Sequence, residues 1–376
     1  MKKDCKQVCA KKTSIGGQAL IEGIMMRGPK MSAMAVRTPD GEIVLEKWEN
    51  KATAKSKLVR LPIVRGVFNF VTSMIDGYKC LMRSAELAGL EDAIEEEQRQ
   101  KEAKKAAKRA KKGEEALAVD PPVSLDAEAE PLVETAEEQS NEKKDSSLLM
   151  GALMVVATVL GVVLAIGLFV MLPTFLYGLL AGWMPFLSSS NAALDSLIKS
   201  VFEGILKIVI LVAYMALVSR MKEIKRTFMY HGAEHKTIFC YEDGKELTVE
   251  NVRKERRFHP RCGTSFLILM LLVGIFVGFF IDPLFILIFG EEFLTLGWIY
   301  TAIRAAVKLL MLPLTMGIGY ELIKLAGRKD NAFTRIISAP GLWLQRITVL
   351  EPTDDMIECA ITAFKEVVPQ DESDRF

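Results

Sequence analysis

The feature that most constrains this chain is the length of its uncharged, apolar stretches. No Asp, Glu, Lys or Arg occurs between Asp145 and Asp195, and residues 148–172 form an unbroken uncharged stretch. A helix needs about 20 such residues to cross a bilayer core of about 30 Å. The chain therefore cannot fold as a single soluble globule, and residues 148–172 predict a first membrane span.

Three further spans are predicted at residues 197–218, 265–288 and 296–322. The apolar piece at 174–187 is short and bracketed by Pro173 and Pro185, which favours an interfacial turn over a crossing. Residues 219–264 hold eleven Lys and Arg, whereas the loops at 188–191 and 290–295 hold none. Because cytosolic connections carry such a positive excess, we predict a multipass protein of the cell membrane with both termini in the cytosol.

The segments outside the spans differ in character. Residues 1–15 lack the apolar core of an export signal and predict a flexible N-terminus. Residues 16–90 predict a cytosolic β meander, with a hairpin at Pro39-Asp40-Gly41, and a long amphipathic helix that could pack on the meander or lie in the membrane interface. Residues 91–147 are highly charged, which predicts a disordered insertion or linker. Residues 323–376 predict a cytosolic helical tail, whose last helix starts after Thr353.

Together these segments predict an α-helical multipass membrane protein of about four transmembrane helices with a small N-terminal cytosolic β-plus-helix subdomain. The formal net charge of +1 gives no reason to expect a nucleic acid as partner, so the lipid bilayer is the partner we predict. The six cysteines lack the dense, regular spacing of a disulfide scaffold, which favours free thiols or metal ligands.

The histidines gather in one predicted cytosolic loop, at residues 219–264. All three lie within 29 residues, and Cys240 and Cys262 lie in the same loop. His231 and His235 are four residues apart, so on a helix extending the second span both rings share one face and can bind a single ion. Glu234 completes an H-x-x-E-H arrangement, in which the carboxylate is a general base rather than a ligand.

His259 and Cys262 offer the further donors, because they lie where the chain enters the third span. Imidazole and thiolate favour a divalent transition metal, zinc first. A closed structural zinc site would use four donors: His231, His235, Cys240 and Cys262. In a catalytic site only three donors bind, Glu234 is the base, and Arg261, Lys236 or His259 stabilises developing negative charge. Buried polar histidines without a metal are the remaining alternative.

A second group of charged residues falls inside the predicted spans: Glu203, Lys207, Asp282, Arg304 and Lys308. Unpaired charges are costly in a bilayer, so we expect these side chains to pair with one another. The pairs predict either a network that fixes helix packing or the polar path of a transporter, and packing is favoured because no glycine-broken half-helices accompany them.

Three other charged residues have open roles. Glu321, near the cytosolic end of the fourth span, could be a ligand, a carboxylate that orients an imidazole, or a side chain that snorkels to the interface. Glu22 and Arg27 lie among apolar residues of the meander, where a β-bulge with an ion pair between them is the simplest prediction.

Five segments carry a resemblance to a known family: GGQALIEGIMMRGP, YHGAEHKTIFCYE, HPRCGTSF, GYELIKLAGR and APGLWLQRITVLEPTDD. They resemble the YqhQ family of bacterial membrane proteins, a family of unknown function described as predicted metal-dependent enzymes. The resemblance covers residues 15–364 apart from the charged insertion. It implies a multipass membrane protein with a metal site, and it points to these positions: His231, Glu234, His235, His259 and Cys262.

From these observations we expect a metal-dependent membrane enzyme, most readily a hydrolase, with His231 and His235 as ligands and either Cys262 or His259 as the third. Its substrate is expected to be embedded in the membrane or linked to a lipid and to be cleaved at the cytosolic face. The first alternative is a non-enzymatic membrane scaffold or regulator held by structural zinc. The second is a transporter.

Overall fold

A computed structural model describes residues 12–50, 61–89, 156, 158–184, 189, 191–290, 292, 297–328, 331–369 and 371. The chain forms two compact units, one of residues 1–91 with 177–376 and one of residues 92–176. The N-terminus up to residue 11 and the charged insertion at 91–147 lie outside the described residues.

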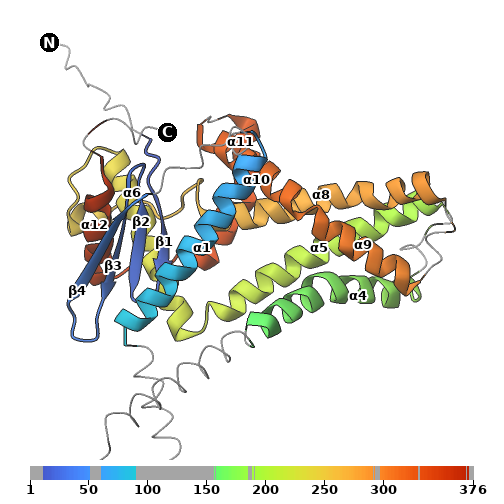
Figure 1. Cartoon of the computed structure of the whole chain (residues 1–376), viewed down its shortest axis with the longest axis horizontal. Helices are drawn as coiled ribbons and strands as arrows, with labels where there is room; N and C mark the ends of the chain where they lie inside the picture. Colours follow the sequence, from blue (N-terminus) through green and yellow to red (C-terminus); the bar gives the residue numbers. More distant parts are fainter. Residues whose placement is uncertain are drawn as a thin grey trace, which may run out of the picture. The chain divides into compact units, whose positions relative to one another are not determined.

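Four strands near the N-terminus form one antiparallel sheet in the order β1-β2-β3-β4, which confirms the predicted meander (Figure 1). The strands are β1 Gly16–Leu20, β2 Gly23–Arg27, β3 Met31–Arg37 and β4 Ile43–Glu49. The predicted bulge is wrong, because the β1–β2 pairing runs without interruption to a two-residue turn at Leu20↔Gly23. The hairpin predicted at Gly41 is present, and its φ of 87° suits a glycine.

The rest of the described chain is mainly helical. The helices are α1 Val64–Leu87, the π-helical turn η2 Gly167–Met171, α4 Leu172–Ala181, α5 Ala192–Val218, α6 Lys222–Glu242, α7 Val249–Arg253, α8 Gly263–Phe289, α9 Trp298–Leu310, α10 Leu312–Arg328, α11 Ala332–Thr348 and α12 Asp354–Val367. The last helix begins directly after Thr353, as predicted.

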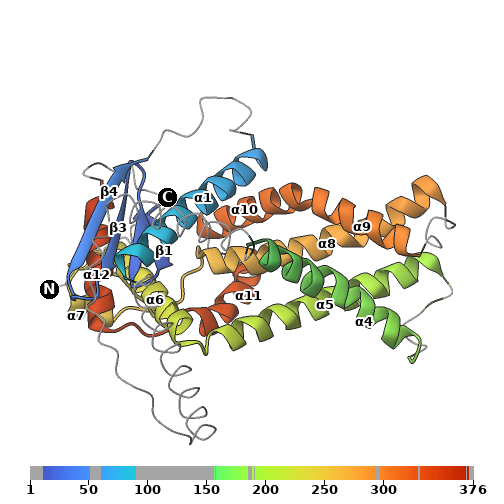
Figure 2. The ribbon, with the colours of Figure 1, turned by 60° about the horizontal axis from the view of Figure 1, so that its bottom comes forward.

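Helices cover both faces of the sheet. Side chains alternate between the faces of a strand, and accordingly Ile24 and Met26 pack with α6 and α12, while Met25 and Met34 pack with Cys80 of α1. Figure 2 shows α12 and α6 beside the sheet within the larger unit. The sheet therefore holds α6, which carries two of the histidines, in a buried core that includes the C-terminal helix.

Helix α1 packs on the sheet, which is one of the two environments that its sequence suggested, and it also contacts α10. Toward the sheet it contributes Cys80, and toward α10 its Arg65 donates to Glu321 with an Nε–Oε1 distance of 2.6 Å. Glu321 is therefore part of a helix–helix ion pair and is neither a ligand of the histidine cluster nor a partner of its rings. A row of large apolar side chains on α1 remains exposed: Val64, Val71, Met74, Ile75 and Tyr78.

Three helical segments are long and apolar enough to cross a membrane: Thr158–Ala181, Leu194–Val218 and Gly263–Phe289. The pair α9 and α10 gives a fourth if the two helices, which are bent by 41°, are taken as one span. By length and composition the protein is thus a membrane protein with three or four candidate spans, where about four were predicted.

The interfacial turn predicted for residues 174–187 is wrong as far as Ala181, because α4 continues the first span through Pro173. Proline lacks an amide hydrogen, and its ring crowds the carbonyl of the preceding turn. The π-helical turn η2 ends directly before it, with the Leu172 N–H bonded to the Gly167 carbonyl. We attribute the continuity to this wider turn, which accommodates the proline within the helix.

Two helices predicted as continuous are broken. The fourth span divides at Met311, because Pro313 has no N–H to continue the hydrogen bonds of α9 and suits the first turn of a new helix. The expected extension of the second span is also wrong: α5 ends at Val218, and α6 starts anew after Met221, which is extended with ψ 136°.

The charges predicted inside the spans pair with one another. Arg304 of α9 donates to Asp282 of α8 and to Glu203 of α5, each at 2.8 Å, and the three side chains are at most 3% exposed. Lys308 donates to the second oxygen of Glu203 at 3.1 Å, whereas Lys207 takes part in none of these bonds. The network therefore joins three helices, as the packing interpretation predicted.

The predicted pair between Glu22 and Arg27 is wrong. Glu22 lies in the β1–β2 turn and accepts from Arg226 of α6 at 2.5 Å, whereas Arg27 contacts Asp76 of α1 at 3.3 Å. Both residues therefore join the sheet to the helices that cover it. The prediction failed because it considered only neighbours on the hairpin, whereas these long side chains reach residues of the packed helices.

Candidate metal centre

Three side chains from two separate stretches converge beside the sheet. Helix α6 brings the His231 and His235 rings together with a centroid distance of 4.5 Å, and Cys262 reaches them from the N-cap of α8. All three are buried, and one donor atom from each lies within 4.8 Å of the others. His231 Nε2 is 3.0 Å from Cys262 Sγ. The structure thus places Cys262, rather than His259, as the third member.

Hydrogen bonds to backbone carbonyls orient both rings. His231 Nδ1 donates to the Thr348 carbonyl at 2.9 Å, and His235 Nδ1 donates to the Arg257 carbonyl at 2.5 Å. A carbonyl only accepts, so in each neutral ring the proton is on Nδ1 and the lone pair is on Nε2. Metal-binding imidazoles are commonly held by such a bond on the other nitrogen. Both rings are therefore prepared to bind an ion through Nε2.

The donor set fits a divalent transition metal. Zinc binds thiolate at about 2.3 Å and imidazole at about 2.0–2.1 Å, so tetrahedral donors lie roughly 3.5 Å apart. The three donors already lie within 4.8 Å, and small rotations of the side chains bring them to that spacing. Two imidazoles and one thiolate are thus a donor set that could hold a metal ion.

The surroundings of Cys262 favour the thiolate that a metal requires. Burial opposes ionisation, but the two histidines outweigh it and lower the pKa of Cys262 well below its ordinary value. Its sulfur also accepts from the Thr264 N–H at 3.4 Å, at the N-terminus of α8, where a helix favours negative charge. Burial also opposes the charged form of His231, yet the thiolate raises the pKa of that ring. Cys262 and His231 therefore favour the thiolate–imidazolium form over the neutral form.

Glu234 lies on the same cavity as the cluster. The cavity measures about 150 Å³ and is lined by Glu234, His235 and Cys262 among others. Glu234 Oε1 accepts from the Gly17 N–H of β1 at 2.9 Å, and burial raises the pKa of the carboxyl. A buried carboxylate with a raised pKa, fixed through one oxygen, has the properties of a general base.

His259 is held by a different group. Its ring lies 5.6 Å from that of His235, but its Nε2 lies 3.2 Å from Arg261 Nη2 and 3.9 Å from Glu242 Oε2. Burial lowers the pKa of His259 to about 4. Burial raises the pKa of Glu242, but the His259 hydrogen bond, the Arg261 charge and other contacts outweigh this effect and lower it. Arg261 also donates to the Thr13 carbonyl at 2.9 Å, and both residues line the metal cavity.

Two residues of this environment were not identified from the sequence. Gln345 of α11 accepts from the His259 N–H at 2.8 Å and donates to its carbonyl at 2.7 Å, and no local pattern marks it. Glu242 lies seven residues after His235 on α6, so helical periodicity could have placed both on one face.

Two other suggested residues lie outside the cluster. Cys240 is packed in the core beneath the sheet, with its thiol 3.5 Å from the Glu246 carbonyl. Lys236 donates to the Arg253 carbonyl at 2.8 Å and pairs with Glu351. Within the described part of the chain, the four-donor site that would include Cys240 is therefore not assembled.

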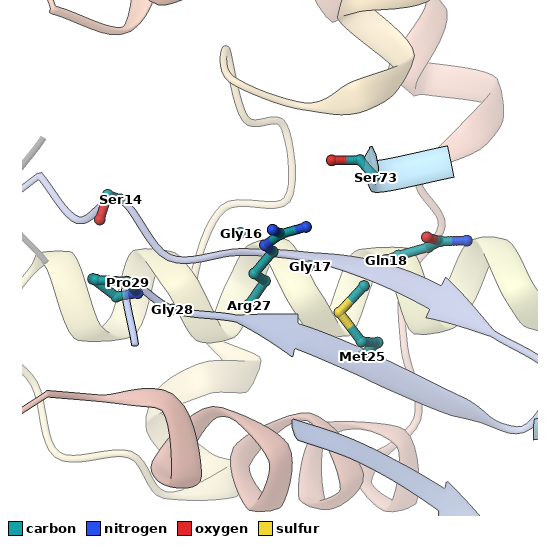
Figure 3. Close-up of a pocket in the computed structure, with 9 residues that line it drawn as sticks. All are labelled: Ser14, Gly16, Gly17, Gln18, Met25, Arg27, Gly28, Pro29 and Ser73. Atoms are coloured by element: carbon teal, nitrogen blue, oxygen red, sulfur yellow. The ribbon is translucent and has the colours of Figure 1, made fainter. Parts of the chain in front are cut away.

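A second cavity lies across β1 from the metal cavity. It measures about 340 Å³, and Figure 3 shows Arg27, Gln18 and Met25 of the sheet on one side and Ser73 of α1 on the other. Gly16 and Gly17 line both cavities, so the backbone of β1 separates them.

Comparison with known proteins places the chain in a family. The model for a family of proteins of unknown function, DUF1385, matches residues 61–370. The chain belongs to this family. It is also similar to the uncharacterized protein YqhQ of Bacillus subtilis (strain 168), with 31% identity over 357 residues that cover 94% of this chain and 92% of the relative. No solved structure matches. The resemblance seen in the motifs is confirmed, and the three donors and Glu234 lie inside the matched region.

Proposed function

We propose that this DUF1385 protein is a metal-dependent hydrolase that acts on a membrane-embedded or lipid-linked substrate at the cytosolic face of the membrane. The observation that carries the proposal is a cluster of three buried donors, two of which, His235 and Cys262, line one small cavity together with Glu234. Catalytic zinc sites use three protein donors and leave the fourth position open, whereas structural sites are closed by four.

In the proposed reaction each residue has a distinct task. His231, His235 and Cys262 would hold the ion, which when bound supplies Lewis-acid activation of a water molecule. Glu234 accepts the proton of that water through Oε2, because Oε1 is held by the Gly17 N–H. Arg261, which lines the cavity, offers positive charge to a developing anion, and Glu242 keeps it in position.

The position of the site supports a substrate in the membrane. Cys262 caps α8, and the candidate span starts at the next residue, Gly263. The donors thus lie at the boundary between the apolar segment and the sheet. The Lys and Arg between residues 219 and 264 support a cytosolic position for this boundary.

Metal content and function of variants test the proposal. Purified wild-type protein is expected to contain about one ion per chain, His231→Gln and Cys262→Ala to lose it, and Cys240→Ala to keep it as the control. Glu234→Gln is expected to keep the ion but to fail in restoring the phenotype of a strain that lacks the gene. Full restoration by Glu234→Gln would refute the enzymatic assignment.

The burial of the donors favours a second candidate, a non-enzymatic scaffold or regulator stabilised by zinc. His235 is 1% exposed and Cys262 is 6% exposed, as expected for a structural site. In that case Cys262→Ala would release the metal and lower the melting temperature, while Glu234→Gln would be silent. The transporter alternative gains no support from the described spans, because the charges of Arg304, Asp282 and Glu203 pair with one another.

A further inference from the structure

A larger cavity adjoins the metal centre on the side of α11. It measures about 400 Å³ and has a mixed lining: Lys12, Phe239, Glu242, Arg256, Phe258, His259, Pro260, Arg261, Ala326, Thr334, Arg335, Ser338, Ala339 and Leu342. His259 and Arg261 line this cavity and the metal cavity alike. A ligand held in the larger space would therefore lie next to the proposed reaction site.

Positive charge dominates the lining. Four cationic residues line it: Lys12, Arg256, Arg261 and Arg335. Glu242 is the one carboxylate among the described lining residues, and it is already paired with Arg261. The Arg256 guanidinium stacks over the Phe239 ring at 4.3 Å, which keeps its hydrogen-bonding edge available at the cavity wall. Arginine recognises phosphate through two parallel hydrogen bonds. The lining therefore selects an anion and favours a phosphate group.

The cavity lies at the ends of two candidate spans. Pro260 and Arg261 immediately precede the apolar helix that starts at Gly263, and Ala326 is the last residue of the bent span formed by α9 and α10. Lipid phosphates lie at the same depth, just outside the hydrocarbon core. The basic residues are thus at the level of the headgroups.

Helix α11 shows how the cavity meets the bilayer. Arg335, Ser338, Ala339 and Leu342 follow helical spacing and form the face that lines the cavity. A different face carries large apolar side chains that are more than half exposed: Phe333, Ile336 and Trp343. Such a helix lies in the membrane interface with its apolar face toward the acyl chains. The basic residues of the lining thus offer positive charge to a lipid headgroup, while Phe258 and Leu342 offer apolar contact to the first part of the acyl chain.

We propose that this cavity binds the phosphate group of an anionic membrane lipid, with Arg256 and Arg335 as its main contacts. As the substrate class of the hydrolase the inference rests on the proposed function, since the lipid phosphate would be held beside the metal centre. Binding itself needs neither the metal nor Glu234. It can therefore be tested separately from hydrolysis.

The test is a binding titration of the purified full-length chain in detergent, treated with a chelator, using dioleoyl phosphatidic acid and native mass spectrometry. One lipid is expected to bind per chain, and dioleoylglycerol, which lacks the phosphate, is expected to bind at least tenfold more weakly. Arg256→Gln and Arg335→Gln are each expected to weaken phosphatidic acid binding about tenfold. Lys254→Gln removes a charge two residues from Arg256, outside the lining, and is expected to bind like wild type.

Three outcomes would overturn the inference. The first is equal binding by wild type and by the double variant of Arg256 and Arg335, and the second is an equal loss in Lys254→Gln. In the third, soluble glycerol 3-phosphate binds as tightly as the lipid, which would assign the cavity to a free phosphate ester. Glu234→Gln separates the two proposals, because it is expected to bind the lipid normally while losing function. If Glu234→Gln loses function but the wild-type protein does not bind the lipid, the hydrolase proposal stands and the lipid-binding proposal is refuted.

Discussion

Replacing Gly17 by alanine tests whether β1 positions the candidate base. A Cβ at Gly17 would lie 2.6 Å from the Met25 carbonyl oxygen, 2.9 Å from Met26 Sδ and 3.1 Å from Glu234 Cδ. Contacts of 3.4 Å or more are ordinary, and the nearest atom belongs to the backbone. The strand therefore has to move by up to about 0.8 Å, the difference between those distances. Such a shift breaks the 2.9 Å bond from the Gly17 N–H to Glu234.

The cost has two parts. Overpacking a buried contact costs about 1–3 kcal/mol, and losing a hydrogen bond to a charged group costs about 1.5–3 kcal/mol. The sum is roughly 2.5–6 kcal/mol, which for a chain of 376 residues corresponds to a fall in melting temperature of at least about 3 °C. Gly16→Ala is the matched control, since a Cβ there meets no atom within 4 Å.

The assay is thermal unfolding of both variants in the same detergent, combined with metal analysis. Gly17→Ala is expected to melt lower and, because Glu234 is not a ligand, to keep its metal. It should also show the functional defect of Glu234→Gln in the deletion strain, whereas Gly16→Ala behaves as wild type. Melting temperatures that agree within 1 °C would show that β1 does not hold the carboxylate as argued.

Other parts of the structure give further predictions. Arg304→Met leaves two buried carboxylates without their shared partner and is expected to cost about 3–5 kcal/mol in detergent unfolding; wild-type stability would contradict the network. Gly232→Ala places a Cβ 1.9 Å from the Leu350 carbonyl and is expected to lower the melting temperature strongly, whereas Gly274→Ala, with open space around it, is expected to be neutral. For His259, burial lowers the pKa from 6.5 to about 4, so the unfolded chain takes up the proton first and the metal-free protein loses stability as pH falls from about 6.5 to about 4. The free energy of unfolding is expected to fall by about 3 kcal/mol over this range, as measured by melting curves at a series of pH values. His259→Gln should remove this pH dependence.

The local features of the fold could be predicted from the sequence. The uncharged stretches gave the spans, and the Pro39-Asp40-Gly41 turn gave the β3–β4 hairpin, because both depend on neighbouring residues. Two of the errors occurred where a helix continued or ended at a proline, whereas the break between α5 and α6 involves no proline. Pro173 is accommodated by the π-helical turn before it, while Pro313 coincides with a break. A proline restricts the backbone locally, but the preceding turn decides whether the helix continues.

For the metal centre, the sequence by itself determined that His231 and His235 share a face, since a spacing of four residues fixes this on any α-helix. Only the tertiary structure decided that Cys262 completes the group, that His259 turns to Glu242 and Arg261, and that β1 closes over the cavity. The physical reason is that helical periodicity acts over a few residues, whereas these contacts join segments that meet only when the sheet, α6 and α8 pack together. Burial then sets the charge states, and burial depends on the whole fold.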